Sequence, residues 1–112
     1  MDSAELQTFY SRPLEAILSD SRGPEAHAAL LEALETGRVR AALRREDGAW
    51  EAQSWVKAAI LAGFRATDLV ELPGAWGPAF DRAAFQPRLF TAAEGVCLVP
   101  GGSAVCRGAF VA

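Results

Sequence analysis

Apolar residues in the first part of the chain recur at helical spacing. A stripe at i, i+3, i+4 positions covers residues 6–18, which predicts a helix that Asp2 or Ser3 caps. Pro13 interrupts the stripe, so the helix either kinks there or restarts with Ser11 as the cap. The pattern therefore predicts a helical beginning.

A second helical pattern lies between Pro24 and Gly37, with leucines on one face at residues 30–34. Proline suits a first helical turn and glycine suits the position after the last one. His27, the only histidine, falls in the first turn, where we expect a surface or half-buried position. No second histidine or cysteine stands at ligand spacing, so we expect no metal site.

The middle of the chain predicts a hairpin followed by a helix. Residues 39–43 and 49–52 can form two strands joined by Asp47-Gly48, a strong hairpin signal. From Gln53 the period becomes helical and predicts about three turns that end near Gly63. Two tryptophans flank the junction and are expected to pack in the core: Trp50 and Trp55.

Residues 69–90 begin with a strand candidate at 69–72, which Pro73-Gly74 should end. Residues 73–90 have no clean period, and we expect a long ordered loop. Four aromatic side chains are expected to pin this loop: Trp76, Phe80, Phe85 and Phe90. Glu94-Gly95 predicts a turn, and residues 96–99 predict a strand.

The end of the chain has a six-residue period. Val99, Val105 and Val111 recur at this step, as do Gly102 and Gly108. Such a period is typical of a parallel β-helix, whose core is buried only after several coils stack. With barely two hexads present, we expect the chain to be the front end of a larger protein in which a repeat array begins.

Composition and charge exclude several classes of partner. The net charge is −3, and the densest basic stretch, residues 38–45, is followed at once by Glu46 and Asp47. Nucleic-acid binding is therefore not expected. No apolar run approaches the length of a membrane span, and the first residues lack the features of a signal peptide. We expect a cytoplasmic location with both cysteines as free thiols.

Candidate chemistry is sparse. The sequence has no suggestive Ser/His/Asp set, no phosphate-binding glycine loop and no Cys-x-x-Cys, and its acidic residues should be solvated charges on helix faces. Cys97 and Cys106 stand nine residues apart. They are either two independent thiols or, on consecutive β-helix rungs, neighbours in space.

Two blocks of sequence carry a family resemblance. The first runs from Gly37 to Arg65 and contains Asp47-Gly48-Ala49-Trp50 and Trp55-Val56-Lys57-Ala58-Ala59-Ile60-Leu61. The second runs from Glu94 to Ala112 and contains Val99-Pro100 and Arg107-Gly108-Ala109-Phe110-Val111-Ala112. Together with Phe80-Asp81-Arg82, they closely resemble the N-terminal region of the tetrahydrodipicolinate N-succinyltransferase family of bacterial lysine and diaminopimelate biosynthesis.

The resemblance implies an α+β fold. A helix-rich domain with a β-hairpin would cover residues 1–95, and residues 96–112 would begin a truncated left-handed parallel β-helix of the hexapeptide-repeat acyltransferases. In that family three chains pack side by side, and succinyl-CoA meets the cyclic dicarboxylate substrate in clefts between them. The catalytic acids and the coenzyme A groove come after the position of Ala112, so we expect no catalytic, cofactor or metal residues here and no activity of this chain alone. The alternatives are a non-catalytic assembly or capping domain that supports trimerisation, and an unrelated α+β binding domain.

Two cysteines depart from the family pattern. At Cys97 the family has an arginine that binds a substrate carboxylate, and at Cys106 it usually has another arginine. A thiol cannot replace the bidentate, permanently charged guanidinium. We therefore expect even an extended chain to bind the dicarboxylate poorly.

Overall fold

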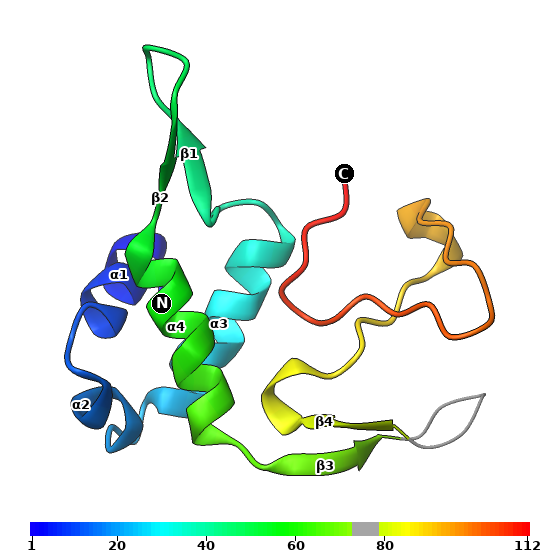
Figure 1. The fold of residues 1–112 in the computed structure, drawn as a ribbon, viewed down its shortest axis with the longest axis horizontal. Coiled ribbons are helices and arrows are strands. Elements are labelled where there is room, and N and C mark those ends of the chain that lie inside the picture. The colour runs from blue at the N-terminus through cyan, green and yellow to red at the C-terminus, as the bar shows by residue number, and fades with distance from the viewer. Residues whose placement is uncertain (73–78) are drawn as a thin grey trace.

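Among the residues that the structure describes, four α-helices form the body of the molecule and two small antiparallel sheets extend from it (Figure 1). The computed structural model describes residues 1–72 and 79–112. The elements, in chain order, are α1 (Ser3–Tyr10), α2 (Leu14–Leu18), α3 (Gly23–Glu35), β1 (Ala42–Arg44), β2 (Trp50–Ala52), α4 (Ser54–Ala66), β3 (Leu69–Leu72), β4 (Ala79–Arg82) and the 3₁₀ turns η1 (Ala83–Phe85) and η2 (Ala92–Glu94). This arrangement confirms the expected α+β class.

The first apolar stripe forms two helices. Asp2 caps α1 by accepting a hydrogen bond from the Glu5 backbone N–H at 2.8 Å, while the Glu5 carboxylate accepts one from the Asp2 N–H. Pro13, with extended backbone, precedes α2, so the chain restarts there. The expected cap at Ser11 is wrong: this residue ends α1, and its hydroxyl donates to the Gln7 carbonyl at 2.6 Å.

The core lies where α1, α3 and α4 meet. Pro24 stands in the first turn of α3, and Gly37 follows its end with φ +74°, both as the sequence predicts. The largest fully buried side chains among the described residues come from these three helices: Leu6, Leu30 and Val56. Burying such aliphatic side chains contributes roughly 1.5–3 kcal/mol each.

The β1–β2 hairpin projects away from the helices, as Figure 1 shows. The turn at Asp47-Gly48 is confirmed, with Gly48 at φ +84°. The first strand begins later than expected, because Val39 is buried in the core and its N–H bonds to the Ala33 carbonyl instead. The expected core position of Trp50 is wrong, since this side chain on the projecting hairpin is 70% exposed, whereas Trp55 packs against the core.

Helix α4 continues to Ala66, three residues beyond the predicted end at Gly63. Gly63 is buried within the helix, where the Phe85 ring leaves no room for a Cβ atom. The glycine therefore serves close packing rather than helix termination.

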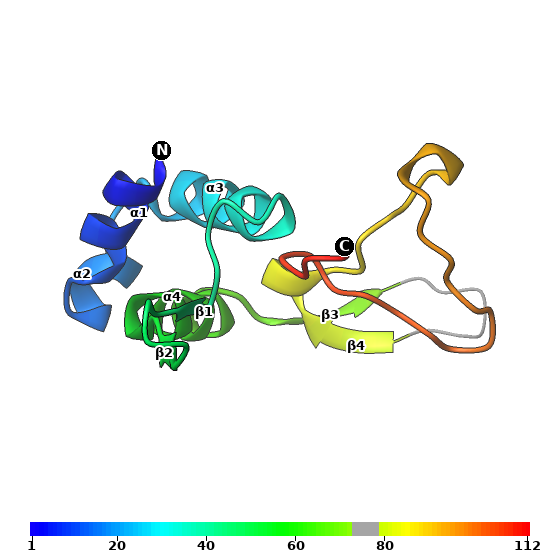
Figure 2. The same cartoon turned by 90° about the horizontal axis from the view of Figure 1, so that it is seen from above.

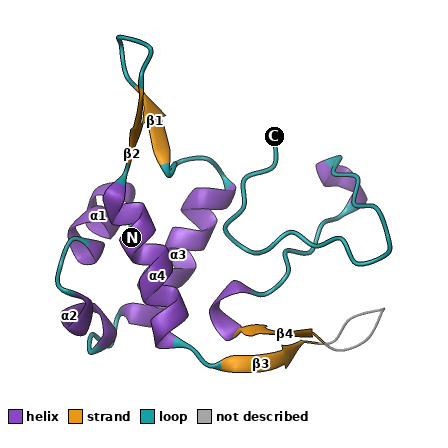
Figure 3. Cartoon of the chain, viewed as in Figure 1, coloured by secondary structure: helices purple, strands orange, loops and turns teal. Residues whose placement is uncertain are grey.

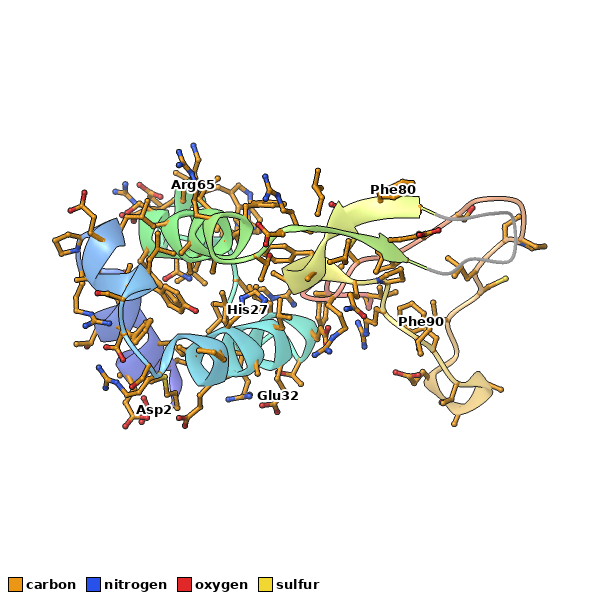
Figure 4. The ribbon with its side chains drawn as sticks, turned by 90° about the horizontal axis from the view of Figure 1, so that it is seen from below. Asp2, His27, Glu32, Arg65, Phe80 and Phe90 are labelled. Carbon is orange, nitrogen blue, oxygen red and sulfur yellow. The ribbon has the colours of Figure 1, made fainter. Side chains whose placement is uncertain are left out.

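The strand at Leu69–Leu72 is confirmed, but the long loop expected over residues 73–90 is wrong for residues 79–85, which form a strand and a 3₁₀ turn. Residues 79–82 form β4, which pairs with β3 in a register that sets Leu69 opposite Arg82. Of the four pinning aromatics, Phe85 is 8% exposed and does pack, and Phe90 is half-buried beneath the Arg88 guanidinium. Phe80 is 70% exposed on the outer side of the hairpin (Figure 4), and Trp76 lies with Pro73-Gly74 outside the described residues. Residues 79–82 form a strand because they pair with β3, and the sequence around residues 79–82 does not reveal this partner.

Residues 96–112 form turns and extended loop (Figure 3). The turn at Glu94-Gly95 is confirmed, with Gly95 at φ +68°. The strand expected at 96–99 is absent from this described segment, which has one isolated bridge, between Pro87 and Cys106. A β-helix strand needs a neighbouring coil to receive its backbone hydrogen bonds, and the hexad residue Val99 is instead 65% exposed.

Candidate functional site

The sequence singles out two cysteines, and both are exposed free thiols. Cys97 follows the turn at Gly95, in the loop that leads to the hexads. Cys106 lies opposite Pro87 in the isolated bridge, where the Arg88 N–H bonds to Val105 and the Arg107 N–H bonds to Gln86. The backbone on both sides of Cys106 is therefore held.

A carboxylate at the end of α3 receives the chain just after Cys106. Glu35 accepts hydrogen bonds from the Arg107 guanidinium Nε and, at 2.9 Å, from the Gly108 backbone N–H. The Glu35 side chain is only 14% exposed. We call these three residues, Glu35, Arg107 and Gly108, the tail clasp.

The tail clasp changes the acidity of Glu35. Partial burial raises the pKa of this carboxyl, but the hydrogen bonds from Arg107 and Gly108, together with the positive charges of Arg107 and Arg88, act in the opposite direction. The net effect is a pKa below the usual value. Glu35 is therefore ionised at neutral pH, as the tail clasp requires.

Two further contacts hold the tail beside α3. The Arg40 guanidinium lies over the Phe110 ring, 3.7 Å from its centroid, in cation–π geometry. Arg88 donates to the Ala109 carbonyl at 2.9 Å and pairs with Glu94 at 3.7 Å. Figure 2 shows the end of the chain near the C-terminal part of α3 and η1.

His27 joins the helices to the second sheet. Figure 4 shows the ring in the space between α3 and α4. Its Nε2 lies 2.9 Å from the Ala84 carbonyl oxygen and must donate to it, which leaves Nδ1 as a buried acceptor without a partner among the described residues. The ring also meets Phe85 edge to face, with centroids 5.3 Å apart. The half-buried position expected for His27 is confirmed.

A pocket of about 420 Å³ adjoins His27 and is lined mainly by small and apolar side chains of α2, α3 and α4. Tyr10 contributes to the wall, and burial raises the pKa of its hydroxyl to about 12. Asp20 stands at the same pocket and pairs with Arg12 at 3.0 Å and with Arg22 at 2.8 Å.

The expectation that acidic residues are merely solvated is wrong for two of them. Asp20 and Glu35 each have a side chain only 14% exposed, and each carboxylate holds two partners. Sequence reasoning missed the tail clasp because Glu35 and Arg107 are 72 positions apart. The available signal was weak: Arg107-Gly108 belongs to the family-like block, but nothing in that block points to Glu35.

The contacts around the end of the chain form an anchoring site. Across residues 1–72 and 79–112, no three His, Cys, Asp or Glu side chains gather in a way that could hold a metal ion. Within the same residues, no helix has the length and apolar character needed to cross a membrane. The tail clasp and the contacts of Arg40 and Arg88 fix the last part of the chain to the helical body.

Residues 14–66, from α2 to the end of α4, match the family described as tetrahydrodipicolinate N-succinyltransferase N-terminal. The matched region, which holds α2, α3, the β1–β2 hairpin and α4, is thus similar to the N-terminal domain of an N-succinyltransferase family. The particular family is that of the tetrahydrodipicolinate N-succinyltransferases, to which the chain belongs through this domain.

Curated relatives carry the same name, 2,3,4,5-tetrahydropyridine-2,6-dicarboxylate N-succinyltransferase. The Roseobacter denitrificans protein is 40% identical over 74 residues, which are 62% of this chain and 27% of the relative. The Granulibacter bethesdensis protein is 35% identical over 99 residues (84% and 34%), and the Methylococcus capsulatus protein is 39% identical over 93 residues (79% and 33%). The chain therefore spans about a third of the length of these relatives, and the family resemblance seen in the sequence is confirmed.

Proposed function

We propose that the chain serves as the N-terminal part of a succinyl-CoA-dependent N-succinyltransferase that acts on tetrahydrodipicolinate in lysine and diaminopimelate biosynthesis. The observation that carries this proposal is the family match over residues 14–66, which includes the hairpin and the buried face of α4. Residues 1–95 form the helical domain and residues 96–112 begin the left-handed β-helix. The left-handed glycine at position 95 supports a boundary there.

The proposed assembly is a cytoplasmic homotrimer. In it, residues 96–112 gain the strand partners that they lack alone, which supports a role for the exposed apolar side chains of this segment: Leu98, Val99, Phe110 and Val111. Succinyl-CoA would be the co-substrate and the cyclic dicarboxylate the acceptor, with the reacting groups supplied by the β-helix. No turnover is expected from the 112 residues alone.

The test is a graft. The matched segment of the Methylococcus capsulatus enzyme is replaced by this chain, and the graft is expressed in a bacterial strain that needs added diaminopimelate because its own enzyme is deleted. Growth without diaminopimelate is the expected result. The matched control is the same enzyme without any N-terminal domain. A stable graft that restores no more growth than this control would overturn the proposal.

Cys97 gives a second prediction in the graft. Because a thiol offers no permanent positive charge to a carboxylate, Cys97→Arg should lower the KM for the dicarboxylate by about tenfold or more and leave the KM for succinyl-CoA unchanged. The comparison variant is Cys97→Ser, which adds no charge. An unchanged KM for the dicarboxylate in Cys97→Arg would refute the role given to this position.

A further inference from the structure

We infer that Glu35 is a positioning residue: its carboxylate docks the chain after Cys106 onto α3 and so sets where the first β-helix segment starts relative to the helical domain. The docking is a property of this chain by itself. Its consequence for substrate binding rests on the proposed function above.

Glu35 is suited to this task because it binds two adjacent residues in different ways. The Arg107 side chain pairs with the carboxylate, and the Gly108 backbone N–H bonds to it at 2.9 Å. A side-chain ion pair alone would tolerate sliding of the tail by a residue, whereas the backbone bond fixes the register. Deleting the carboxylate removes both bonds at once.

The surface of α3 is shaped for the same register. Gly108 adopts φ +91°, and a Cβ atom there would lie 3.0 Å from a methyl group of Leu31. Phe110 then reaches the end of the helix, where its ring comes within 3.1 Å of the position that a Cβ on Gly37 would take. Glycines at both contacts let the tail approach closely, and the Arg40 guanidinium covers the Phe110 ring.

Other ion pairs near the tail do not compete for Glu35. Arg88 pairs with Glu94, and Arg38 pairs with Glu32 on the exposed side of α3. Figure 4 shows Glu32 pointing outward from the helix. Glu32, with a side chain 64% exposed, therefore provides a matched control: a glutamate three residues earlier on the same helix, also paired with an arginine, but without a role in docking.

The docking reaches Cys106 through the backbone. Arg107 donates its N–H to Gln86 at 2.8 Å, and Val105 accepts from the Arg88 N–H at 2.6 Å. Residues 86–88 and 105–107 thus form a short paired unit that the tail clasp ties to α3. Releasing Glu35 frees this unit, and with it the position of Cys106, where the family usually has an arginine.

The first experiment measures amide hydrogen exchange by NMR in the 112-residue chain. Glu35→Ala should raise the exchange rates of the Arg107 and Gly108 amides at least tenfold, while the Leu30 amide in α3 stays protected and shows that the helices remain folded. Glu32→Ala should leave all three rates unchanged. Unchanged Gly108 exchange in Glu35→Ala, or an equal rise in Glu32→Ala, would overturn the inference.

A second pair of variants tests the contact between the tail and α3 by changing the tail instead of the helix. Gly108→Ala meets the Leu31 methyl and should free the tail as Glu35→Ala does, judged by the exchange of the Arg107 amide. Gly95→Ala carries a comparable backbone strain, at φ +68°, but nothing lies within 4 Å of its added Cβ. Equal Arg107 exchange in the two variants would contradict the docking surface on α3.

The functional consequence is read in the graft. Glu35→Ala should raise the KM for the dicarboxylate severalfold with little change in kcat, whereas Glu32→Ala should change neither. An inactive graft would contradict the proposed function and the predicted effect of Glu35 on the KM for the dicarboxylate. The hydrogen-exchange rates of the 112-residue chain would still test whether Glu35 docks the tail onto α3. An active graft with an unchanged KM in Glu35→Ala would confine Glu35 to a structural role and overturn its role in positioning.

Discussion

Gly63 is a residue whose structural role cannot be read from the sequence around it. Glycine near the end of an apolar stripe usually marks the end of a helix. Here the helix continues through Gly63 to Ala66. The position requires glycine because a Cβ atom would lie 2.9 Å from the Phe85 ring and 3.0 Å from the His27 ring. The ring contacts come from α3 and η1, which no window of sequence around Gly63 contains.

Gly63→Ala should destabilise the protein by up to about 2 kcal/mol, because overpacking against two rings costs about 1–3 kcal/mol and the gain in helix propensity offsets roughly 1 kcal/mol of it. Urea unfolding followed by circular dichroism measures the change. Gly23→Ala is the matched control, because its added Cβ meets only a carbonyl oxygen at 3.9 Å. A Gly63→Ala protein as stable as the Gly23→Ala protein would contradict the packing.

Asp20 predicts an acid-dependent loss of stability. Hydrogen bonds from Arg22, helped by Arg12, hold the pKa of this carboxyl well below its usual range. A lowered folded-state pKa stabilises the protein fully above the unfolded value of about 4 and loses this contribution as the pH falls toward the folded-state value. Unfolding in urea between pH 5 and pH 2 should show Asp20→Asn less stable than the wild type at pH 5, with the difference shrinking on acidification. A constant difference would contradict the ion pairs.

Among the elements, those whose partners are close in sequence could be predicted. The capping box at Asp2, the Pro24 start of α3 and the Asp47-Gly48 turn each depend on atoms a few residues apart. Strand β4 could not be predicted, because its structure comes from pairing with β3 across the intervening segment. The strand expected at 96–99 failed for the opposite reason: its pattern suits a strand, but residues 1–72 and 79–112 hold no strand that pairs with it.

The β1–β2 hairpin makes its own prediction. Since Trp50 is 70% exposed on an element that projects from the helices, Trp50→Thr should change the free energy of unfolding by no more than about 0.5 kcal/mol. Leu30→Ala in the core should cost about 2–5 kcal/mol. Urea unfolding of both variants, followed by circular dichroism, measures the two changes in the free energy of unfolding. A cost for Trp50→Thr approaching that of Leu30→Ala would mean that the hairpin packs against the body after all.

At the scale of the whole molecule, the helical domain and the tail are joined by side chains that lie far apart in sequence. The family, the α+β class and most helices could be inferred from sequence, because motif order and local periodicity carry them. The tail clasp could not, because an ion pair between Glu35 and Arg107 leaves no local pattern. The helical domain therefore holds residues 105–110 in a fixed position, where we propose that a β-helix begins.

The most direct test of that account is a steady-state assay of the purified graft of this chain onto the remainder of the Methylococcus capsulatus enzyme. The assay follows the release of free coenzyme A from succinyl-CoA in the presence of tetrahydrodipicolinate. The account predicts substrate-dependent turnover by a trimeric graft, and a higher KM for the dicarboxylate than in the unmodified enzyme because of Cys97. A folded, trimeric graft without turnover, even after Cys97→Arg, would contradict it.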